Sequence, residues 1–266
     1  MVAWLLTSAL LLLAVVPVSA APGKQLCLNC HAVHYARLGS CTACHRGNPS
    51  SERTNIAHQR LIAARYASFT LAGDPLLRQG TGLIEQYACR RCHVIDGRGN
   101  RLSVNLDQVA MRRSPEELEA SIRRPVQNMP DFRMDETQAT AVVTALLSAG
   151  GHQPAAGGVR PQVVHFDQGA RVDKDLFSIK CGPCHRLLTK NRGGLGRGDA
   201  GPNLSGLLSP FYPKGYRDGE SWNEEGLRRW LDNPRAVRSG ARMRPVKLSG
   251  TEFRELLEIL GVAPAE

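Results

Sequence analysis

One five-residue motif accounts for every cysteine in this chain of 266 residues. The motif is Cys-x-x-Cys-His, and its four copies contain all 8 cysteines. Two cysteines at this spacing lie on one face of a helical turn, and a histidine follows at once. A structural zinc site also uses Cys-x-x-Cys pairs, but it does not need a histidine directly after each pair. The copies are CLNCH at 27–31, CTACH at 41–45, CRRCH at 89–93 and CGPCH at 181–185.

This motif is typical of covalent haem attachment. Its two thiols can form thioethers with the two vinyl groups of one porphyrin, and the histidine can ligate the iron from the same side. We therefore predict four covalent haems of the c type, in preference to two four-cysteine zinc sites or a thioredoxin-like redox pair. The predicted thioether residues are Cys27, Cys30, Cys41, Cys44, Cys89, Cys92, Cys181 and Cys184, and the predicted proximal iron ligands are His31, His45, His93 and His185.

With these motifs the chain resembles a multihaem, here tetrahaem, c-type cytochrome. Residues 80–148 and 169–262 are each similar to a class I, monohaem cytochrome c domain, and residues 24–60 are similar to the compact dihaem segment of multihaem electron-transfer cytochromes. The resemblance implies a mainly α fold, in which a small haem-nucleated dihaem segment precedes two class I-like helical domains. The combination is similar to cytochromes of extracellular electron conduits and of metal or selenite-tellurite reduction operons.

Local composition indicates a signal peptide, a linker and the boundaries of the domains. Residues 3–16 are apolar and are followed by small residues, so we expect a signal peptide cleaved after Ala20, with an uncleaved membrane anchor as the alternative. Export to the periplasm or cell envelope fits haem attachment to thiols, which in bacteria takes place outside the cytoplasm. The expected parts are the signal peptide at 1–20, the dihaem segment at 21–68, the first cytochrome c-like domain at 69–149, a Gly/Pro-rich linker at 150–168 and the second cytochrome c-like domain at 169–266.

The two cytochrome c-like domains repeat one order of elements: a helix leading into the haem motif, a loop, a middle helix, a methionine and a closing helix. In the first domain we expect a middle helix with Ser114 as N-cap and Pro115 at its first position, and a closing helix at 135–151 stopped by glycine. In the second domain the expected helices are at 173–180, at 223–234 with an Asn-Pro stop, and at 249–261 with Ser249 or Thr251 as cap; a further helix is expected at 55–69 of the dihaem segment.

Each iron needs a second axial ligand, or it is an open reaction site. Met129, in the stretch NMPDF, resembles the methionine loop of class I cytochromes, which assigns it to the haem on His93. Met243 holds the same place before the closing helix of the second domain, which assigns it to the haem on His185.

Two other methionines are alternatives in the first domain: Met111, expected in the core, and Met134, expected at the surface where a helix starts. The stretch GPNLSG also resembles class I cytochromes and implies that the carbonyl of Pro202 accepts a hydrogen bond from His185. The first domain lacks the equivalent proline, which leaves the partner of His93 open.

The dihaem segment has no plausible methionine, but it has two spare histidines, His34 and His58. We predict bis-histidine ligation, with His34 on the haem of His45 and His58 on the haem of His31. The reverse pairing is also possible, and a surface histidine is the alternative for each.

Four further side chains have open roles. His152 and His165 are expected to be solvated in the linker, although either could replace a methionine in another redox state. Trp222 and Trp230 lie near the last haem motif in the predicted domain, either as core residues or as indole donors to a haem propionate.

The formal net charge of +10 does not indicate nucleic-acid binding, because haem propionates offset part of it and arginines near haem pair with them. Six-coordinate irons bind no substrate unless they lose a ligand. The sequence therefore predicts an electron-transfer protein rather than an enzyme, with redox proteins as donor and acceptor and an outer-membrane conduit complex as a possible assembly. The alternatives are a haem-based reductase or peroxidase with one open iron, and a subunit of a cytochrome filament.

Thioether ligation raises the reduction potential relative to two imidazoles, so electrons should run from the dihaem segment toward the C-terminal haems. Because a Gly/Pro-rich linker joins the two cytochrome c-like domains, their haems are expected to titrate nearly independently.

Overall fold

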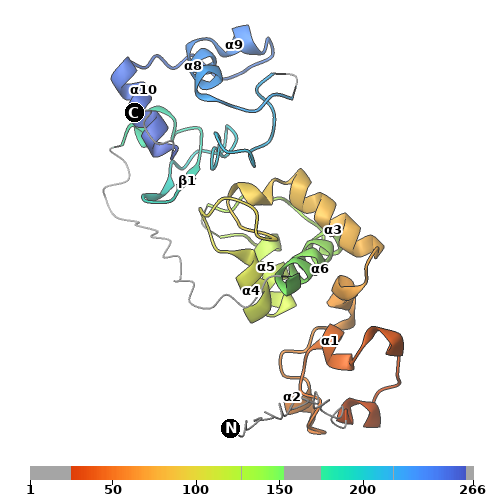
Figure 1. Ribbon diagram of the computed structural model, residues 1–266. Coiled ribbons are helices and arrows are strands. Elements are labelled where there is room, and N and C mark those ends of the chain that lie inside the picture. The colour runs from red at the N-terminus through yellow and green to blue at the C-terminus, as the bar shows by residue number, and fades with distance from the viewer. Residues whose placement is uncertain (1–24, 127, 153–174, 218, 262–266) are drawn as a thin grey trace, which may run out of the picture.

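The computed structural model describes residues 25–126, 128–152, 175–217 and 219–261. The predicted signal peptide and most of the predicted linker, including His165, lie outside these ranges. In space the predicted dihaem segment lies at one end, the first predicted cytochrome c-like domain in the middle and the second at the other end (Figure 1). These names are kept below for the three parts as predicted. The architecture is mainly helical, as predicted. Among the described residues, no helix combines the length and the apolar character needed to cross a membrane.

Short helical turns make up the dihaem segment: η1 (Leu26–Asn29), η2 (Ala36–Leu38), α1 (Cys41–His45), α2 (Thr54–Ala57) and η3 (Ala64–Thr70). The single helix predicted over 55–69 is therefore wrong. Arg60 adopts a left-handed conformation with φ 58°, and the Ile62 N–H donates to the carbonyl of His45 at 2.7 Å. The predicted helix is interrupted because the Ile62 N–H bonds to His45 of α1 and not to a carbonyl of the same helix.

The first cytochrome c-like domain consists of α3 (Pro75–Gln86), η4 (Cys89–Arg91), α4 (Leu106–Arg112), α5 (Pro115–Arg123) and α6 (Glu136–His152). Ser114 caps α5 as predicted, in a capping box with Glu117. The closing helix predicted at 135–151 is confirmed as α6, which includes both glycines and ends one residue later, at His152. A Cβ on Gly150 would lie 2.8 Å from the carbonyl oxygen of Asp107, so this glycine allows α4 to pack closely on α6.

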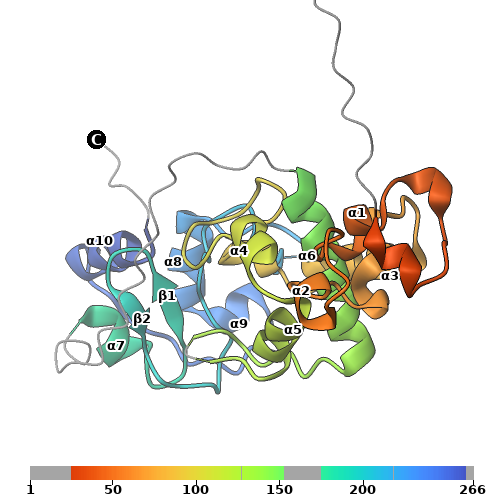
Figure 2. The same cartoon turned by 90° about the horizontal axis from the view of Figure 1, so that it is seen from below.

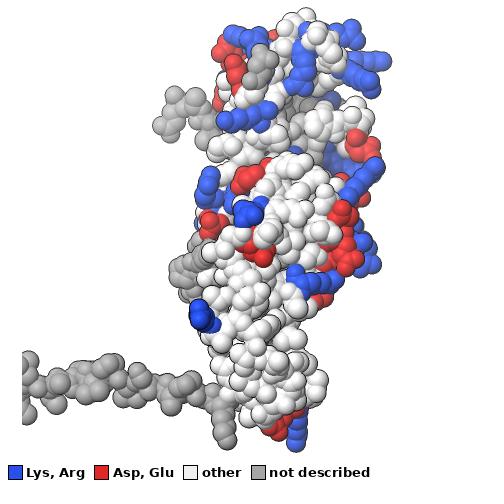
Figure 3. Space-filling model, turned by 90° about the vertical axis from the view of Figure 1, so that its right-hand side faces the viewer, with Lys and Arg blue, Asp and Glu red and all other residues white. Residues whose placement is uncertain are grey.

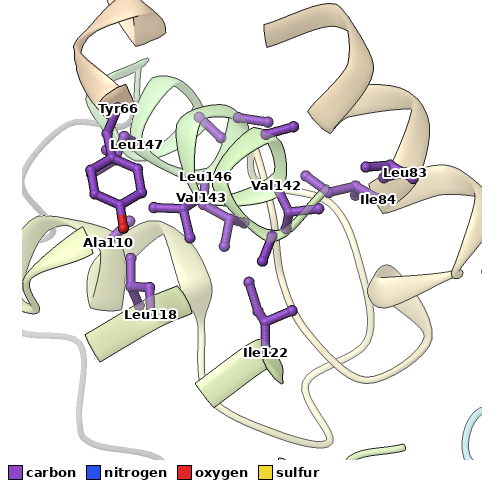
Figure 4. Packing of buried hydrophobic residues seen from close by; sticks show 14 of the residues in the cluster. Tyr66, Leu83, Ile84, Ala110, Leu118, Ile122, Val142, Val143, Leu146 and Leu147 are labelled. Carbon is purple, nitrogen blue, oxygen red and sulfur yellow. The ribbon is translucent and has the colours of Figure 1, made fainter. Parts of the chain in front are cut away.

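The main hydrophobic core surrounds α6, with side chains from α3, α4 and α5 on its sides (Figure 4). Ile62 and Tyr66, which come from the end of the dihaem segment, are fully buried in this cluster. The Tyr66 hydroxyl donates to Glu119 Oε2 at 2.5 Å, which satisfies a buried polar group on α5. The dihaem segment is thus anchored in the core of the domain that follows it.

Two methionines occupy the reverse of their predicted environments. Met134 is buried in the core, whereas Met111 is 47% exposed. Met134 comes just before α6 and packs into the cluster around that helix, whereas Met111 lies on the outer side of the short helix α4, where Arg46 reaches its sulfur.

The second cytochrome c-like domain contains α7 (Leu176–Lys180), β1 (Leu187–Thr189), β2 (Gly193–Leu195), α8 (Glu224–Asp232), α9 (Pro234–Val237) and α10 (Gly250–Ile259). Strands β1 and β2 form an antiparallel hairpin that the sequence did not predict, with Leu188 paired to Gly194. Asn233 ends α8 and also caps α9, and Ser249, rather than Thr251, caps α10 in a capping box. Buried side chains of α7, α8 and α10 share a separate core.

The crossing of α3 and α6 depends on Gly80, because a Cβ there would lie 1.9 Å from the backbone oxygen of Ala141. We predict that Gly80→Ala destabilises the protein by about 1–3 kcal/mol through overpacking. Gly82 lies on the same helix with nothing within 4 Å of its virtual Cβ, so Gly82→Ala should stabilise by up to about 1 kcal/mol. Urea denaturation of the haem-loaded protein, followed by circular dichroism, measures both. Equal effects of the two substitutions would contradict the close helix crossing.

Candidate haem-binding sites

All four motifs form a single helical turn. The histidine N–H donates to the carbonyl of the first cysteine at 3.0 Å for His31, 3.1 Å for His93 and 2.9 Å for His185, and the remaining motif, at 41–45, is helix α1 itself. This turn brings the two thiols and the histidine of each motif to one side, as attachment to a single macrocycle requires. All eight cysteines are free of disulfide bonds.

The environment of the thiols argues against the two alternatives. Burial raises the pKa of Cys89 and of Cys181 to about 11, which disfavours the free thiolate that a redox-active pair would use. Within the described ranges, no three His, Cys, Asp or Glu side chains gather closely enough to hold a metal ion by themselves. The pairs remain separate, which suits thioether attachment and not a four-cysteine cluster.

Three of the proximal histidines are oriented by a backbone carbonyl. The Nδ1 atom lies 3.0 Å from the Ile62 oxygen for His45, 2.9 Å from the Val104 oxygen for His93, and 2.8 Å from the Pro202 oxygen for His185. Such a bond fixes the tautomer and leaves Nε2 free for a metal.

The contact of His185 with Pro202 is the one predicted from the resemblance. No partner could be predicted for His93, and in the structure Val104 has that role. A carbonyl is present on every residue, so no sequence pattern marks this role. Burial also lowers the pKa of His93, which favours the neutral imidazole that metal ligation needs.

In the dihaem segment the histidines lie in two close pairs. The rings of His34 and His45 are 5.6 Å apart with planes only 9° from parallel, and those of His31 and His58 are 6.0 Å apart at 47°. Two imidazoles on one metal, each with a bond of about 2 Å, have ring centres about 6 Å apart. The structure therefore brings together the two pairs predicted from the sequence, at the separation that a shared iron requires.

A cavity occupies the first cytochrome c-like domain beside its haem motif. Cys89, Cys92 and His93 line it together with Met129, so the predicted axial pair shares one cavity. Most of the other lining residues are apolar, as a porphyrin face requires. Leu188 also lines the cavity although it belongs to the second cytochrome c-like domain.

In the second cytochrome c-like domain, Met243 is partly buried against the cluster that contains Cys181. The Trp230 indole N–H donates to Met243 Sδ at 3.0 Å, and Trp222 packs edge-on against Trp230 at 5.4 Å. The indole thus donates a hydrogen bond to the candidate iron ligand. The sequence had suggested only two roles for Trp230, packing in the core or donating to a haem propionate.

The dihaem segment exposes an unusual amount of apolar surface. Of the ten large hydrophobic residues that are exposed in the described part of the chain, six belong to it: Leu28, Val33, Tyr35, Leu38, Ile56 and Leu61. Most of the segment's surface is also uncharged on the face in Figure 3, where it forms the lower end of the molecule. Two porphyrins beside the motifs would cover apolar groups of this kind, so the residues present fit the predicted cofactors.

Comparison with known proteins identifies a family model for part of the chain. Residues 75–144 match the family described as cytochrome C oxidase, cbb3-type, subunit III. No curated protein and no solved structure matches the chain. The match runs from the start of α3 into α6 and includes the third motif and Met129. Residues 75–144 therefore form a cytochrome c domain, which supports haem-based electron transfer as the general role of the chain.

Met129 and Met111 provide a matched test of axial ligation. We predict that Met129→Ala removes about half of the sulfur-to-iron charge-transfer absorption of the oxidised protein and lets carbon monoxide bind one reduced haem. Met111→Ala should change neither property, because Met111 is an exposed side chain of α4. An unchanged near-infrared spectrum in Met129→Ala would remove this residue from the ligand set.

The indole bond to Met243 predicts a shift in potential. An N–H donor withdraws electron density from the thioether and favours ferrous iron, so Trp230→Phe should lower the potential of one haem and leave the others in place. Trp222→Phe, which alters only the packing of the same aromatic pair, is the control. Spectroelectrochemical titration of both variants measures the effect, and a rise in potential, or the same change in both, would contradict it.

Proposed function

We propose that this protein is an exported tetrahaem cytochrome that relays electrons between redox proteins of the cell envelope. The observation that carries the proposal is the placement of His34 beside His45 and of His58 beside His31, at the separation of two ligands on one metal. With Met129 in the cavity of His93, three of the four motifs have a second candidate ligand in place. Met243 is the candidate for the fourth.

When bound, each haem supplies a site for one electron. The chain's own residues determine how readily that electron is accepted. Two imidazoles stabilise ferric iron in the dihaem segment, and imidazole plus thioether stabilises ferrous iron in the other two domains. The carbonyl bonds at Ile62, Val104 and Pro202 hold the imidazoles in one orientation, so little reorganisation accompanies a change of oxidation state.

The spatial order of the domains supports a relay. The dihaem segment and the second cytochrome c-like domain lie at opposite ends, and the first cytochrome c-like domain lies between them (Figure 1). Arg46, just after the second motif, reaches the Ala110 carbonyl of the middle domain at 3.4 Å. With a donor at the dihaem end and an acceptor at the other end, electrons would move from the haems of lower potential to those of higher potential. An outer-membrane conduit complex is one assembly in which such a protein would work.

Haem stoichiometry tests this proposal directly. We predict four haem additions on the denatured mature protein, with residues 1–20 removed, because each motif carries both thiols and a histidine. Replacing both Cys41 and Cys44 with Ala should remove one addition and leave the others. Mass spectrometry of the purified, denatured protein provides the count. Two additions or fewer, together with bound zinc, would overturn the proposal.

A further inference from the structure

The two cytochrome c-like domains meet at the haem motif of the first. Asn100, which follows that motif, donates from Nδ2 to the Arg91 carbonyl at 2.9 Å and to Ser209 Oγ of the second domain at 2.7 Å. Arg91, inside the motif, donates from Nη1 to the Asn203 carbonyl at 3.3 Å. The Arg91 guanidinium also lies 5.8 Å from the centre of the Tyr212 ring. The contact is therefore polar and directed, and its residues come from the attachment site itself.

The far side of this contact belongs to the other candidate haem site. Asn203 directly follows Pro202, whose carbonyl orients His185. Tyr212 donates to the same Asn203 carbonyl at 3.0 Å, so that carbonyl is held from both domains. A short path of one hydrogen bond and one peptide unit thus separates the motif residue Arg91 from the carbonyl that positions the second domain's proximal histidine.

The methionine loop of the first domain is covered in the same way. Asn128, next to Met129, accepts at its backbone carbonyl from Asn203 Nδ2 at 3.3 Å. A Cβ on Gly194 would lie 1.8 Å from Asn128 Nδ2, which shows how closely the hairpin β1–β2 approaches that loop. Leu188 of β1 lines the first domain's cavity. In Figure 2 the hairpin lies between α10 and the loops of the first domain.

Buried groups complete the cover. Ser205 is fully buried, accepts from the Leu188 N–H at 2.8 Å and donates to Asn203 Oδ1 at 2.6 Å. The residue whose carbonyl accepts from Arg91 is thus fixed by a buried side chain of its own domain.

We propose that residues 187–209 form a fixed cover over the haem-attachment edge of the first cytochrome c-like domain, and that the two methionine-containing sites act as one coupled pair. This inference rests on the proposed function. Because the two sites share hydrogen-bonded residues in a region of low exposure, adding an electron to one should lower the electron affinity of the other. Arg91 is the positioning residue at the contact.

Arg90 is the matched control for Arg91. The two arginines are neighbours in the same motif, but Arg90 pairs within its own domain, with Glu85 and with the Ile95 carbonyl. The test uses the full-length haem-loaded protein and compares Arg91→Ala, Arg91→Lys and Arg90→Ala. Amide hydrogen exchange reports the contact, and the resolved methyl resonance of each axial methionine in the reduced state reports each site's titration.

In the unsubstituted protein, the titration of either methionine site should depend on the oxidation state of the other. Arg91→Ala should weaken that dependence and speed amide exchange across residues 203–209 by about tenfold or more. Arg91→Lys should restore part of both effects, since it keeps the charge and one donor, and Arg90→Ala should leave both at their original values. Two sites that titrate independently in the unsubstituted protein, or equal exchange in Arg91→Ala and Arg90→Ala, would overturn the proposal.

The number of haems bound by each variant distinguishes a failure of the proposed cover from a failure of the proposed function. A full set of haems with independent titration would refute the cover and leave the proposed function standing, whereas missing haems in the unsubstituted protein would refute the function itself. Should Arg91→Ala prevent haem attachment, Ser209→Trp places a bulky ring against Asn100 without touching any motif. It should produce the same loss of coupling, and retained coupling would again count against the cover.

Discussion

The hydrogen bond from a proximal histidine to a downstream backbone carbonyl is the contact on which the arrangement of the haem sites depends. It spans 17 residues from His45 to Ile62, 11 from His93 to Val104 and 17 from His185 to Pro202. Each bond closes a loop that passes over the site and fixes the imidazole that the loop surrounds. The three acceptor residues lie in different surroundings. Ile62 is buried in the core around α6, whereas Pro202 leads into the contact between the cytochrome c-like domains.

The dihaem segment has few buried apolar residues of its own, so it needs support from outside its own side chains. The first cytochrome c-like domain has a substantial core of its own, but the dihaem segment leaves large apolar residues exposed around its motifs. In such a segment the porphyrin supplies the missing apolar surface, and folding is linked to its attachment. Its other support is the insertion of Ile62 and Tyr66 into the neighbouring core. We therefore expect the dihaem segment to depend both on haem and on the domain that follows.

The candidate ligands could be predicted from the sequence because they are chemical features of single residues. The motif spacing identified the cysteines and the proximal histidines. The two histidines outside the motifs, His34 and His58, were predicted as second ligands, and their rings lie 5.6 and 6.0 Å from those of His45 and His31. Helix ends with strong caps, such as Ser114 and Ser249, were also predictable. The boundaries of the predicted domains remain predictions.

Features that depend on tertiary packing were not predictable. Nothing in the residue type shows that Val104 provides a carbonyl to His93, or that the backbone of Ile62 breaks the predicted helix at 55–69. Gly150 reads as a helix stop, although its lack of a side chain serves the packing of α4 against α6. The Gly/Pro-rich linker suggested independent domains, but hydrogen bonds from Arg91 and Asn100 join them.

Electron paramagnetic resonance of the fully oxidised protein at low temperature tests the ligand assignment most directly, because the signal of each ferric haem reports its axial ligands. Spin quantitation should give four low-spin haems, two with the signature of paired imidazoles and two with that of imidazole and thioether. A high-spin signal in the native protein, or a single class of low-spin haem, would contradict the account.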